Sequence, residues 1–276
     1  MTTLAVGIVA VVGVLGLLIG SFINVVIHRV PAGKSIVSPP SACPRCGIRI
    51  KSWDNIPVLS WILLGAKCRH CAEPISRRYP LVELSTGLLF VAAAVRFLPQ
   101  FDGTADQPIA GILVLVVFLY FAAISVALAG IDLDTHSLPN VIVLPSYLVV
   151  ALFLGAAAIV VGNYDGLLGA AIGGTALFAC YFILALVYPG GMGFGDVKLA
   201  GVIGMLLGYL GWGELVVGAF AAFLLGGVFG LALLLSKKAN RKSGIPFGPW
   251  MLAGAWLGIF IGERSWNWYL GLFHLA

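Results

Sequence analysis

The chain has 276 residues, of which 61% are hydrophobic and only 10% are charged, and its mean hydropathy is +1.06. In soluble globular domains about a quarter of the residues are charged, so this composition excludes such a domain and indicates a polytopic membrane protein. The net charge of +5 does not require a nucleic-acid partner, because basic loops of membrane proteins set the topology and contact anionic lipid.

Eight apolar runs of roughly 18 to 25 residues match the length that a helix needs to cross a membrane, and they lack the period-two alternation of a barrel. The first run has no basic start and is followed at once by His28 and Arg29, which favours a retained anchor over a signal peptide. The segment from Trp266 onward is too short to span and suits an interfacial anchor. We expect an all-α polytopic membrane protein with about eight transmembrane helices, at 4–27, 81–98, 109–131, 141–161, 166–188, 197–213, 215–235 and 248–262.

The segment 28–80, between the first two predicted helices, is the only long polar part of the chain. It contains two C-x-x-C pairs, Cys43 with Cys46 and Cys68 with Cys71, separated by 21 residues. Two such pairs at this spacing are typical of a four-thiolate zinc site, as in a zinc ribbon. Four thiolates leave no coordination position open, so we expect the zinc to be structural. The alternatives are a pair of disulfides or a redox motif.

The distribution of basic residues predicts the orientation, since loops rich in Lys and Arg stay in the cytoplasm. With eight helices and the N-terminus outside, 14 of the 16 Lys and Arg residues fall in cytoplasmic segments. The C-terminus is then also outside. We therefore expect three parts: a first transmembrane helix (1–27), a cytoplasmic insert with the four cysteines (28–80) and a membrane core (81–276). Disulfides are rare in a reducing compartment, which favours zinc in the insert.

Two aspartates lie at the cytoplasmic ends of apolar runs. Asp132 comes directly after the run 109–131, and Asp196 ends the glycine-rich loop 189–195. Ionisable groups at membrane depth are functional candidates because burying a charge is costly. When two carboxyls meet, one is driven to hold a proton. The two then supply a base that activates water and an acid that polarises a peptide carbonyl, which is the chemistry of an aspartic protease.

Simpler explanations stay open for each of these residues. Asp196 can serve as a helix cap, and Asp134 is either a solvated loop residue or a competitor of Asp132 for the catalytic role. His136 and Lys198 either tune the carboxyls electrostatically or are a loop residue and a snorkelling cation.

Several motifs together resemble the type IV prepilin peptidases, which are leader peptidases and N-methyltransferases of the GxGD type. The matching segments are Gly20 to Pro31, the two cysteine pairs, Ile75 to Glu83, the G-x-G-D motif that ends at Asp196, and Pro246 to Pro249. The resemblance implies that Asp132 and Asp196 are catalytic. It implies cleavage of the basic leader of prepilins or pseudopilins after a glycine, at the cytoplasmic face of a bacterial inner membrane. It also implies methylation of the new N-terminal residue, usually phenylalanine, with S-adenosylmethionine as the donor.

The methyl donor has no visible binding motif, since the chain lacks a G-x-G-x-x-G unit. Asn24, Glu73 and Glu83 are candidates because they are polar residues in or near the insert. Glu83 also has a simpler explanation as an interfacial residue that pairs with Arg77 or Arg78.

Two other functions compete with the peptidase. A proton-coupled transporter also uses intramembrane carboxylates, but it places them near the bilayer midplane within repeats. An assembly protein would use the zinc domain to bind partners and would tolerate replacement of both aspartates.

Overall fold

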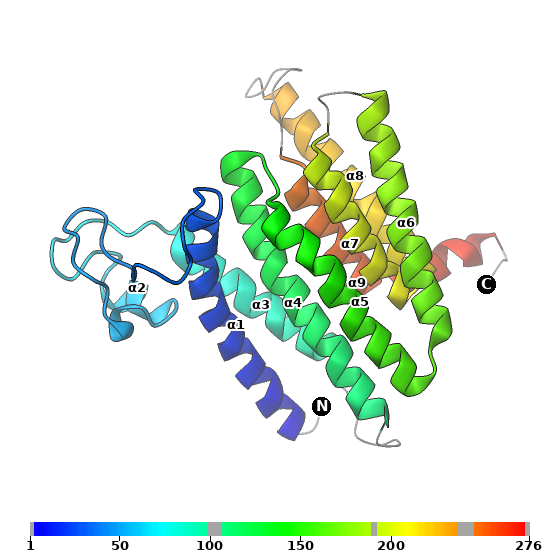
Figure 1. The fold of residues 1–276 in the computed structure, drawn as a ribbon, viewed down its shortest axis with the longest axis horizontal. Coiled ribbons are helices and arrows are strands. Elements are labelled where there is room, and N and C mark those ends of the chain that lie inside the picture. The colour runs from blue at the N-terminus through cyan, green and yellow to red at the C-terminus, as the bar shows by residue number, and fades with distance from the viewer. Residues whose placement is uncertain (1–2, 99–105, 189–191, 237–245, 274–276) are drawn as a thin grey trace. The chain divides into compact units, whose positions relative to one another are not determined.

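The computed structural model describes residues 3–98, 106–188, 192–236 and 246–273. Within these ranges the regular elements are all helices, with two isolated β-bridges and no strand, which confirms the all-α class (Figure 1). The start of the glycine-rich loop (189–191) and the basic stretch 237–245 lie outside the described residues. The elements are α1 (Thr3–Arg29), η1 (Ser52–Asp54), α2 (Leu59–Leu63), α3 (Arg78–Phe97), α4 (Asp106–Thr135), α5 (Asn140–Val161), α6 (Tyr164–Val187), α7 (Phe194–Leu210), α8 (Trp212–Leu235) and α9 (Gly248–Leu272).

Six of the described helices are long and apolar enough to cross a membrane, namely α1, α3, α4, α5, α6 and α8. The predicted runs 197–213 and 248–262 largely coincide with α7 and α9, so both are helical, while the count of eight spans stays a prediction. Helix α9 continues past the predicted run, through Trp266 to Leu272, and the role of its last residues as an interfacial anchor stays a prediction. Asp132 and Asp134 lie in the last turn of α4. Asp134 is exposed, as one of its two explanations expects, but it is not a loop residue.

The chain divides into two compact units, which we describe separately. The first unit holds residues 1–98 and 118–127, and the second holds 99–117 and 128–276. Helix α4 contributes to both units. The three-part division at residues 27 and 80 stays a prediction.

In the first unit, α1 and α3 pack side by side (Figure 1). Three glycines on one side of α1 permit this close approach: a Cβ on Gly16 would lie 2.7 Å from Phe90, and one on Gly20 would lie 2.7 Å from the Cα of Glu83. Gly13 faces Val91 in the same way. Small residues let helix backbones approach closely in lipid, where a hydrophobic driving force between helices is missing.

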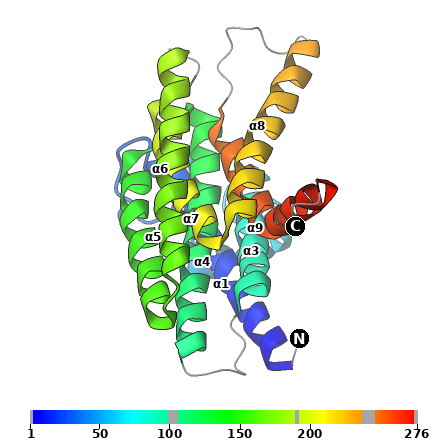
Figure 2. The ribbon, with the colours of Figure 1, turned by 90° about the vertical axis from the view of Figure 1, so that its right-hand side faces the viewer.

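In the second unit, glycines again lie where the helices meet. Gly173 of α6 and Gly204 of α7 face each other backbone to backbone, and α6 and α7 run together in Figure 2. Helices α8 and α9 meet similarly, because a Cβ on Gly258 would lie 2.6 Å from the carbonyl oxygen of Glu214. These contacts bury most of α7, the helix that carries Asp196 in its first turn.

Candidate active site and zinc centre

The four cysteines of the insert come together in the first unit. Their sulfur atoms all lie within 4.8 Å of one another, and the Sγ atoms of Cys43 and Cys71 are 3.7 Å apart. A tetrahedral zinc ion with Zn–S bonds of about 2.3 Å places its sulfur ligands about 3.8 Å apart, so the cluster has the dimensions of a zinc site. The donor set also fits, because four thiolates are a common structural ligand set for zinc.

Each cysteine pair sits in a similar turn. In the first, the N–H of Cys43 donates to the carbonyl of Ile48, and an antiparallel bridge joins residues 42 and 49. In the second, the N–H of Cys68 donates to the carbonyl of Glu73, and a bridge joins residues 67 and 74. The residue four positions after the first cysteine of each turn has a positive φ, +69° at Gly47 and +56° at Ala72. The repetition of one local geometry supports a ribbon-like metal site.

Protons are held unevenly within the cluster. The backbone N–H groups of Cys46 and Arg45 donate to the Cys43 sulfur and lower its pKa to about 6. For Cys71 the backbone N–H of Glu73 acts in the same direction, but burial and the neighbouring sulfur atoms outweigh it and raise the pKa to about 12. The Cys43 sulfur is therefore a thiolate near neutral pH, whereas a bound cation would have to displace the proton from Cys71.

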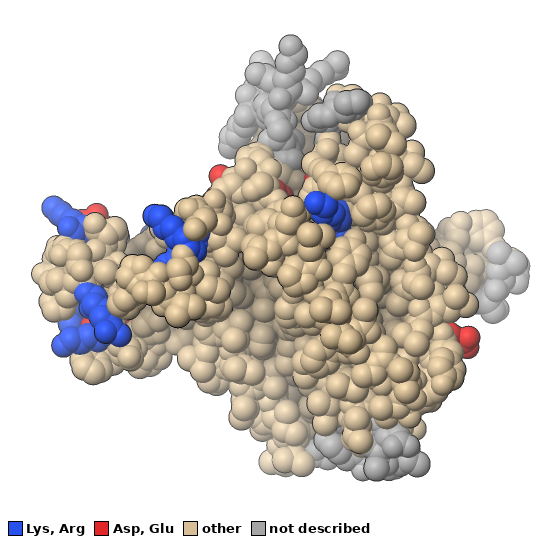
Figure 3. Space-filling model, viewed as in Figure 1, with Lys and Arg blue, Asp and Glu red and all other residues tan. Residues whose placement is uncertain are grey.

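Two ion pairs join parts of the insert. Arg45 donates to Glu73 at 2.7 Å, and Arg69 donates to Asp54 at 2.6 Å. Asp54 and Glu73 are the only acidic residues in the segment 28–80, which has nine Lys and Arg residues. Figure 3 shows the basic side chains gathered on this segment. His70, which lies between Arg69 and Cys71, is exposed.

Asp132 is buried in the second unit at the end of α4, with 4% of its surface exposed. Its Oδ2 atom accepts a hydrogen bond of 3.0 Å from the N–H of Gly248, the first residue of α9. The first N–H groups of a helix have no partner within the helix, so a carboxylate is stabilised there. A bond between residues 116 positions apart therefore orients this carboxyl.

Asp196 is buried in the first turn of α7, with 9% of its surface exposed. Its Oδ2 atom accepts a hydrogen bond of 3.0 Å from the N–H of Gly193, which precedes the helix. The N-cap of α7 is Gly193, so Asp196 is not the N-cap that the simpler explanation expects; it is the third residue of the helix, and its side chain caps the N–H of Gly193 as in a capping box. This contact occupies one carboxyl oxygen, so a cap does not exclude a second role.

The two carboxyls belong to one local cluster, and they lie close enough for their charges to interact. Leu138 links the two sides of this cluster. A Cβ on Gly195 would lie 2.9 Å from the Leu138 Cβ, and a Cβ on Gly248 would lie 3.3 Å from its Cδ2 and 2.8 Å from Asp132 Oδ2. The lack of side chains at these two glycines is therefore what allows the ends of α4, α7 and α9 to approach. We call Asp132 and Asp196 the aspartate pair.

The neighbouring polar candidates differ in position. Asp134 is exposed, unlike Asp132. His136 is also exposed; its backbone has a φ of +50°, and its N–H donates to the main-chain carbonyl of Asp132. Lys198 donates to the Asn140 side chain at 2.9 Å and lies over the ring of Phe194, 4.8 Å from its centroid.

Of the three residues predicted to bind the methyl donor, Asn24 lies on α1 and Glu83 on α3, both in the first unit. Asn24 donates to the carbonyl of Tyr79 at 3.2 Å. Glu83 is buried, and its carboxyl accepts a 2.7 Å bond from the N–H of Val58 and a bond from the hydroxyl of Ser21. Glu73 is in the insert, bound to Arg45.

Sequence reasoning missed the roles of Gly248 and Leu138. The Pro246 to Pro249 motif contained the available signal, because a proline one residue into a helix marks its start and places free N–H groups there. No local pattern marks Leu138, since its contacts are with residues far along the chain.

Comparison with known proteins agrees with these observations. Residues 14–97 match the bacterial peptidase A24 N-terminal domain, and residues 118–231 match the type IV leader peptidase family. Among curated proteins, a prepilin leader peptidase/N-methyltransferase of Pseudomonas aeruginosa is 35% identical over 93% of this chain and 91% of its own length. Proteins of the same name from Stutzerimonas stutzeri and Burkholderia pseudomallei are also 35% identical, over 91% and 90% of this chain and 90% and 84% of their own lengths. No solved structure matches.

These relatives give no support to a transporter. The identity extends over nearly the whole chain, and the two family matches together span the cysteine insert and both aspartates. The chain belongs to the type IV leader peptidase family, and it is a multi-pass membrane protein.

Proposed function

We propose that the protein is an intramembrane aspartic endopeptidase that removes the leader of type IV prepilins or pseudopilins and then methylates the new N-terminus. The single observation that carries the proposal is the aspartate pair, two buried carboxyls that lie within range of each other's charge and are each held by a backbone N–H. Relatives that carry the name of this activity are 35% identical over more than 90% of the chain.

The aspartate pair supplies a base and an acid. Two adjacent carboxyls do not both ionise readily, so one is ionised and the other holds a proton. The ionised carboxyl takes a proton from water, whose oxygen bonds to the scissile carbonyl carbon, while the protonated carboxyl donates to the carbonyl oxygen. The C–N bond then breaks, and the leaving amine takes up a proton from the pair. No covalent enzyme intermediate forms.

The predicted topology suits such a substrate. A prepilin with an apolar helix and a basic cytoplasmic leader has its scissile junction at the membrane surface. We propose that both termini are outside, that the aspartate pair faces the cytoplasm, and that the protein resides in the bacterial inner membrane. The asymmetry of 14 against two basic residues supports this orientation.

Zinc would be held by Cys43, Cys46, Cys68 and Cys71 as a structural ion. With four protein ligands it has no open position for water or substrate. Its role would be to order an insert that is too small to bury much apolar surface by itself.

Methyl transfer would use S-adenosylmethionine and a site in the first unit. The neutral amine attacks the methyl carbon, the S–C bond breaks, and the amine then loses a proton, so the site must mainly position two reactants and tolerate a cation. A buried carboxylate tolerates a sulfonium ion, which favours Glu83, with Asn24 nearby as a polar contact. Glu73 is the weaker candidate because Arg45 already neutralises it.

The experiment is to incubate the purified protein in detergent with a model prepilin, with and without S-adenosylmethionine, and to measure product masses. The wild type should cleave after the leader glycine and add a methyl group, while Asp132→Asn and Asp196→Asn should not cleave. Asp134→Asn tests the competing carboxylate and should retain cleavage. Cleavage at the wild-type rate by both variants of the aspartate pair would refute the assignment, and a product without the added mass would refute the methyl transfer.

A further inference from the structure

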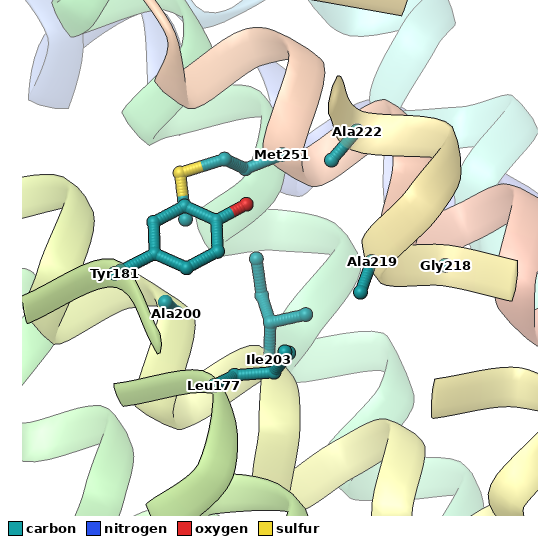
Figure 4. A pocket seen from close by; sticks show the side chains of 8 residues that line it. All are labelled: Leu177, Tyr181, Ala200, Ile203, Gly218, Ala219, Ala222 and Met251. Atoms are coloured by element: carbon teal, nitrogen blue, oxygen red, sulfur yellow. The ribbon is translucent and has the colours of Figure 1, made fainter. Parts of the chain in front are cut away.

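The cavity between α6, α7, α8 and α9 in the second unit is too small for a ligand (Figure 4). Its volume is about 10 Å³, which is room for roughly one water molecule, and its lining is apolar or glycine apart from Tyr181. The insert in the first unit, in contrast, exposes a surface that combines apolar side chains with positive charge.

Five large apolar side chains are exposed on α2 and on the segment before it. They are Trp53, Ile56, Leu59, Ile62 and Leu63, with exposed fractions between 46% and 74%, and we call them the α2 surface. Its last three members are spaced three and one residues apart, so they share one face of α2. A contiguous apolar patch on a polar segment marks an interaction site.

One buried side chain orders this surface. The Ser60 hydroxyl donates to the carbonyl of Trp53 at 2.9 Å and accepts a 2.9 Å bond from the N–H of Ile56. Ser60 itself lies on α2 and is 6% exposed. The segment before α2 is therefore fixed to the helix, and the exposed side chains of both parts belong to one ordered unit.

The α2 surface is also tied to a membrane-spanning helix. The N–H of Val58, the residue before α2, donates to the Glu83 carboxyl at 2.7 Å. Glu83 lies five residues beyond the first residue of α3, which is about 7.5 Å along the helix axis. Leu81 and Leu84, on either side of Glu83, are exposed apolar side chains, as expected where lipid surrounds a helix. Helix α2 therefore begins beside the membrane-spanning part of α3 and not beyond its end.

Basic side chains accompany the apolar ones. Lys51 lies over the ring of Trp53, with its Nζ atom 5.1 Å from the centroid. Lys67 is exposed and follows Leu63 by four residues. The segment 28–80 as a whole has nine Lys and Arg residues against two acidic ones (Figure 3). This charge attracts anionic lipid headgroups, and it disfavours a basic peptide leader as the occupant of the surface.

We propose that the α2 surface docks on the membrane in which the protein is embedded. Its apolar side chains would lie at the boundary between headgroups and acyl chains, with Lys51 and Lys67 on anionic headgroups. Tryptophan is favoured at this level, and an amphipathic helix buries its apolar face about 5 to 10 Å into it. The bond between Val58 and Glu83 places the start of α2 at a similar depth. The inference does not depend on the reaction that the protein catalyses.

The test uses the full chain in lipid nanodiscs of phosphatidylcholine, with or without phosphatidylglycerol. A fluorescent noncanonical amino acid takes the place of Leu63, and its quenching is measured with lipids brominated on the acyl chains and with iodide in the water. In anionic nanodiscs the brominated lipid should quench it to an extent comparable with the same fluorophore at Leu88, an exposed residue of α3. Iodide should quench it weakly.

The lysines are tested in the same labelled protein. Lys51→Gln together with Lys67→Gln should lower the ratio of docked to undocked insert in anionic nanodiscs, roughly 5-fold for each lysine. The melting temperature should not change, because both side chains are exposed. Lys34→Gln is the control, since Lys34 is an exposed lysine of the insert that lies outside the α2 surface, five residues after α1. It should leave the quenching unchanged.

Three outcomes would overturn the inference. Quenching by iodide alone would show that the α2 surface faces water. A fluorophore that is shielded from both quenchers would show that protein, and not lipid, covers the surface. Lipid quenching that is the same in neutral and anionic nanodiscs and in the double lysine variant would refute the contact with anionic headgroups. If the label at Leu63 lowers the melting temperature, the same measurement at Ile62 decides, because both residues share one face of α2.

Discussion

Gly248 offers a direct way to test whether the position of the Asp132 carboxyl matters. Replacing it by alanine adds a Cβ that would lie 2.8 Å from Asp132 Oδ2, where ordinary contacts begin at 3.4 Å. The carboxyl would have to move by about 0.6 Å, the difference between these distances. Because a misplacement of 1 Å can cost about 100-fold in rate, we expect kcat for leader cleavage to fall roughly 10- to 20-fold.

The same substitution should not destabilise the protein. Alanine is favoured over glycine in a helix by about 1 kcal/mol, and the other close contact, 3.3 Å to Leu138, involves the end of a flexible side chain. Gly155→Ala is the matched control, since a Cβ in the middle of α5 meets no atom within 4 Å. This variant should cleave at the wild-type rate.

The assay is the initial rate of leader cleavage at saturating substrate, measured by mass spectrometry, with the melting temperature measured in the same detergent. Wild-type kcat in Gly248→Ala would show that the carboxyl does not need its observed position, and the geometric reasoning would be wrong. Equal losses in both variants would instead point to a general effect of alanine in these helices.

Two further predictions concern the insert. Cys43→Ser together with Cys46→Ser should lower both the zinc content and the melting temperature of the purified protein. The control is Cys180→Ser, at an exposed position, which should change neither quantity. Elemental analysis that finds no zinc in the wild type would refute this prediction. The Arg69 side chain donates to the Asp54 carboxyl and holds its pKa below the ordinary value of an aspartate. The contact therefore stabilises the insert fully when the pH is above the pKa of an unfolded aspartate. This stabilisation is lost as the pH falls through the lower pKa that Asp54 has in the folded protein. Asp54→Asn should remove this acid dependence from the protease susceptibility of the insert, and an unchanged pH profile would contradict the assignment.

Local sequence was sufficient for the features that depend on local chemistry. Hydropathy over about 20 residues decides whether a segment can cross a membrane, and six predicted runs are helices that meet that criterion. The four cysteines could be paired from their spacing, because each C-x-x-C turn forms its own hydrogen bonds. Local hydropathy could not show that α4 continues past Asp132 to Thr135, because the last turn of that helix is polar.

The arrangement of the candidate site depended on tertiary structure. The bond from Gly248 to Asp132 and the contact of Leu138 with Gly195 join residues that are 116 and 57 positions apart. Such contacts arise when helices pack, and they leave no periodic pattern in any one segment. Sequence alone therefore determined that this is a helical membrane protein with a four-cysteine insert and two aspartates at helix ends. Only the packing of α4, α7 and α9 decided which atoms hold those carboxyls, because these contacts depend on the relative positions of separate helices.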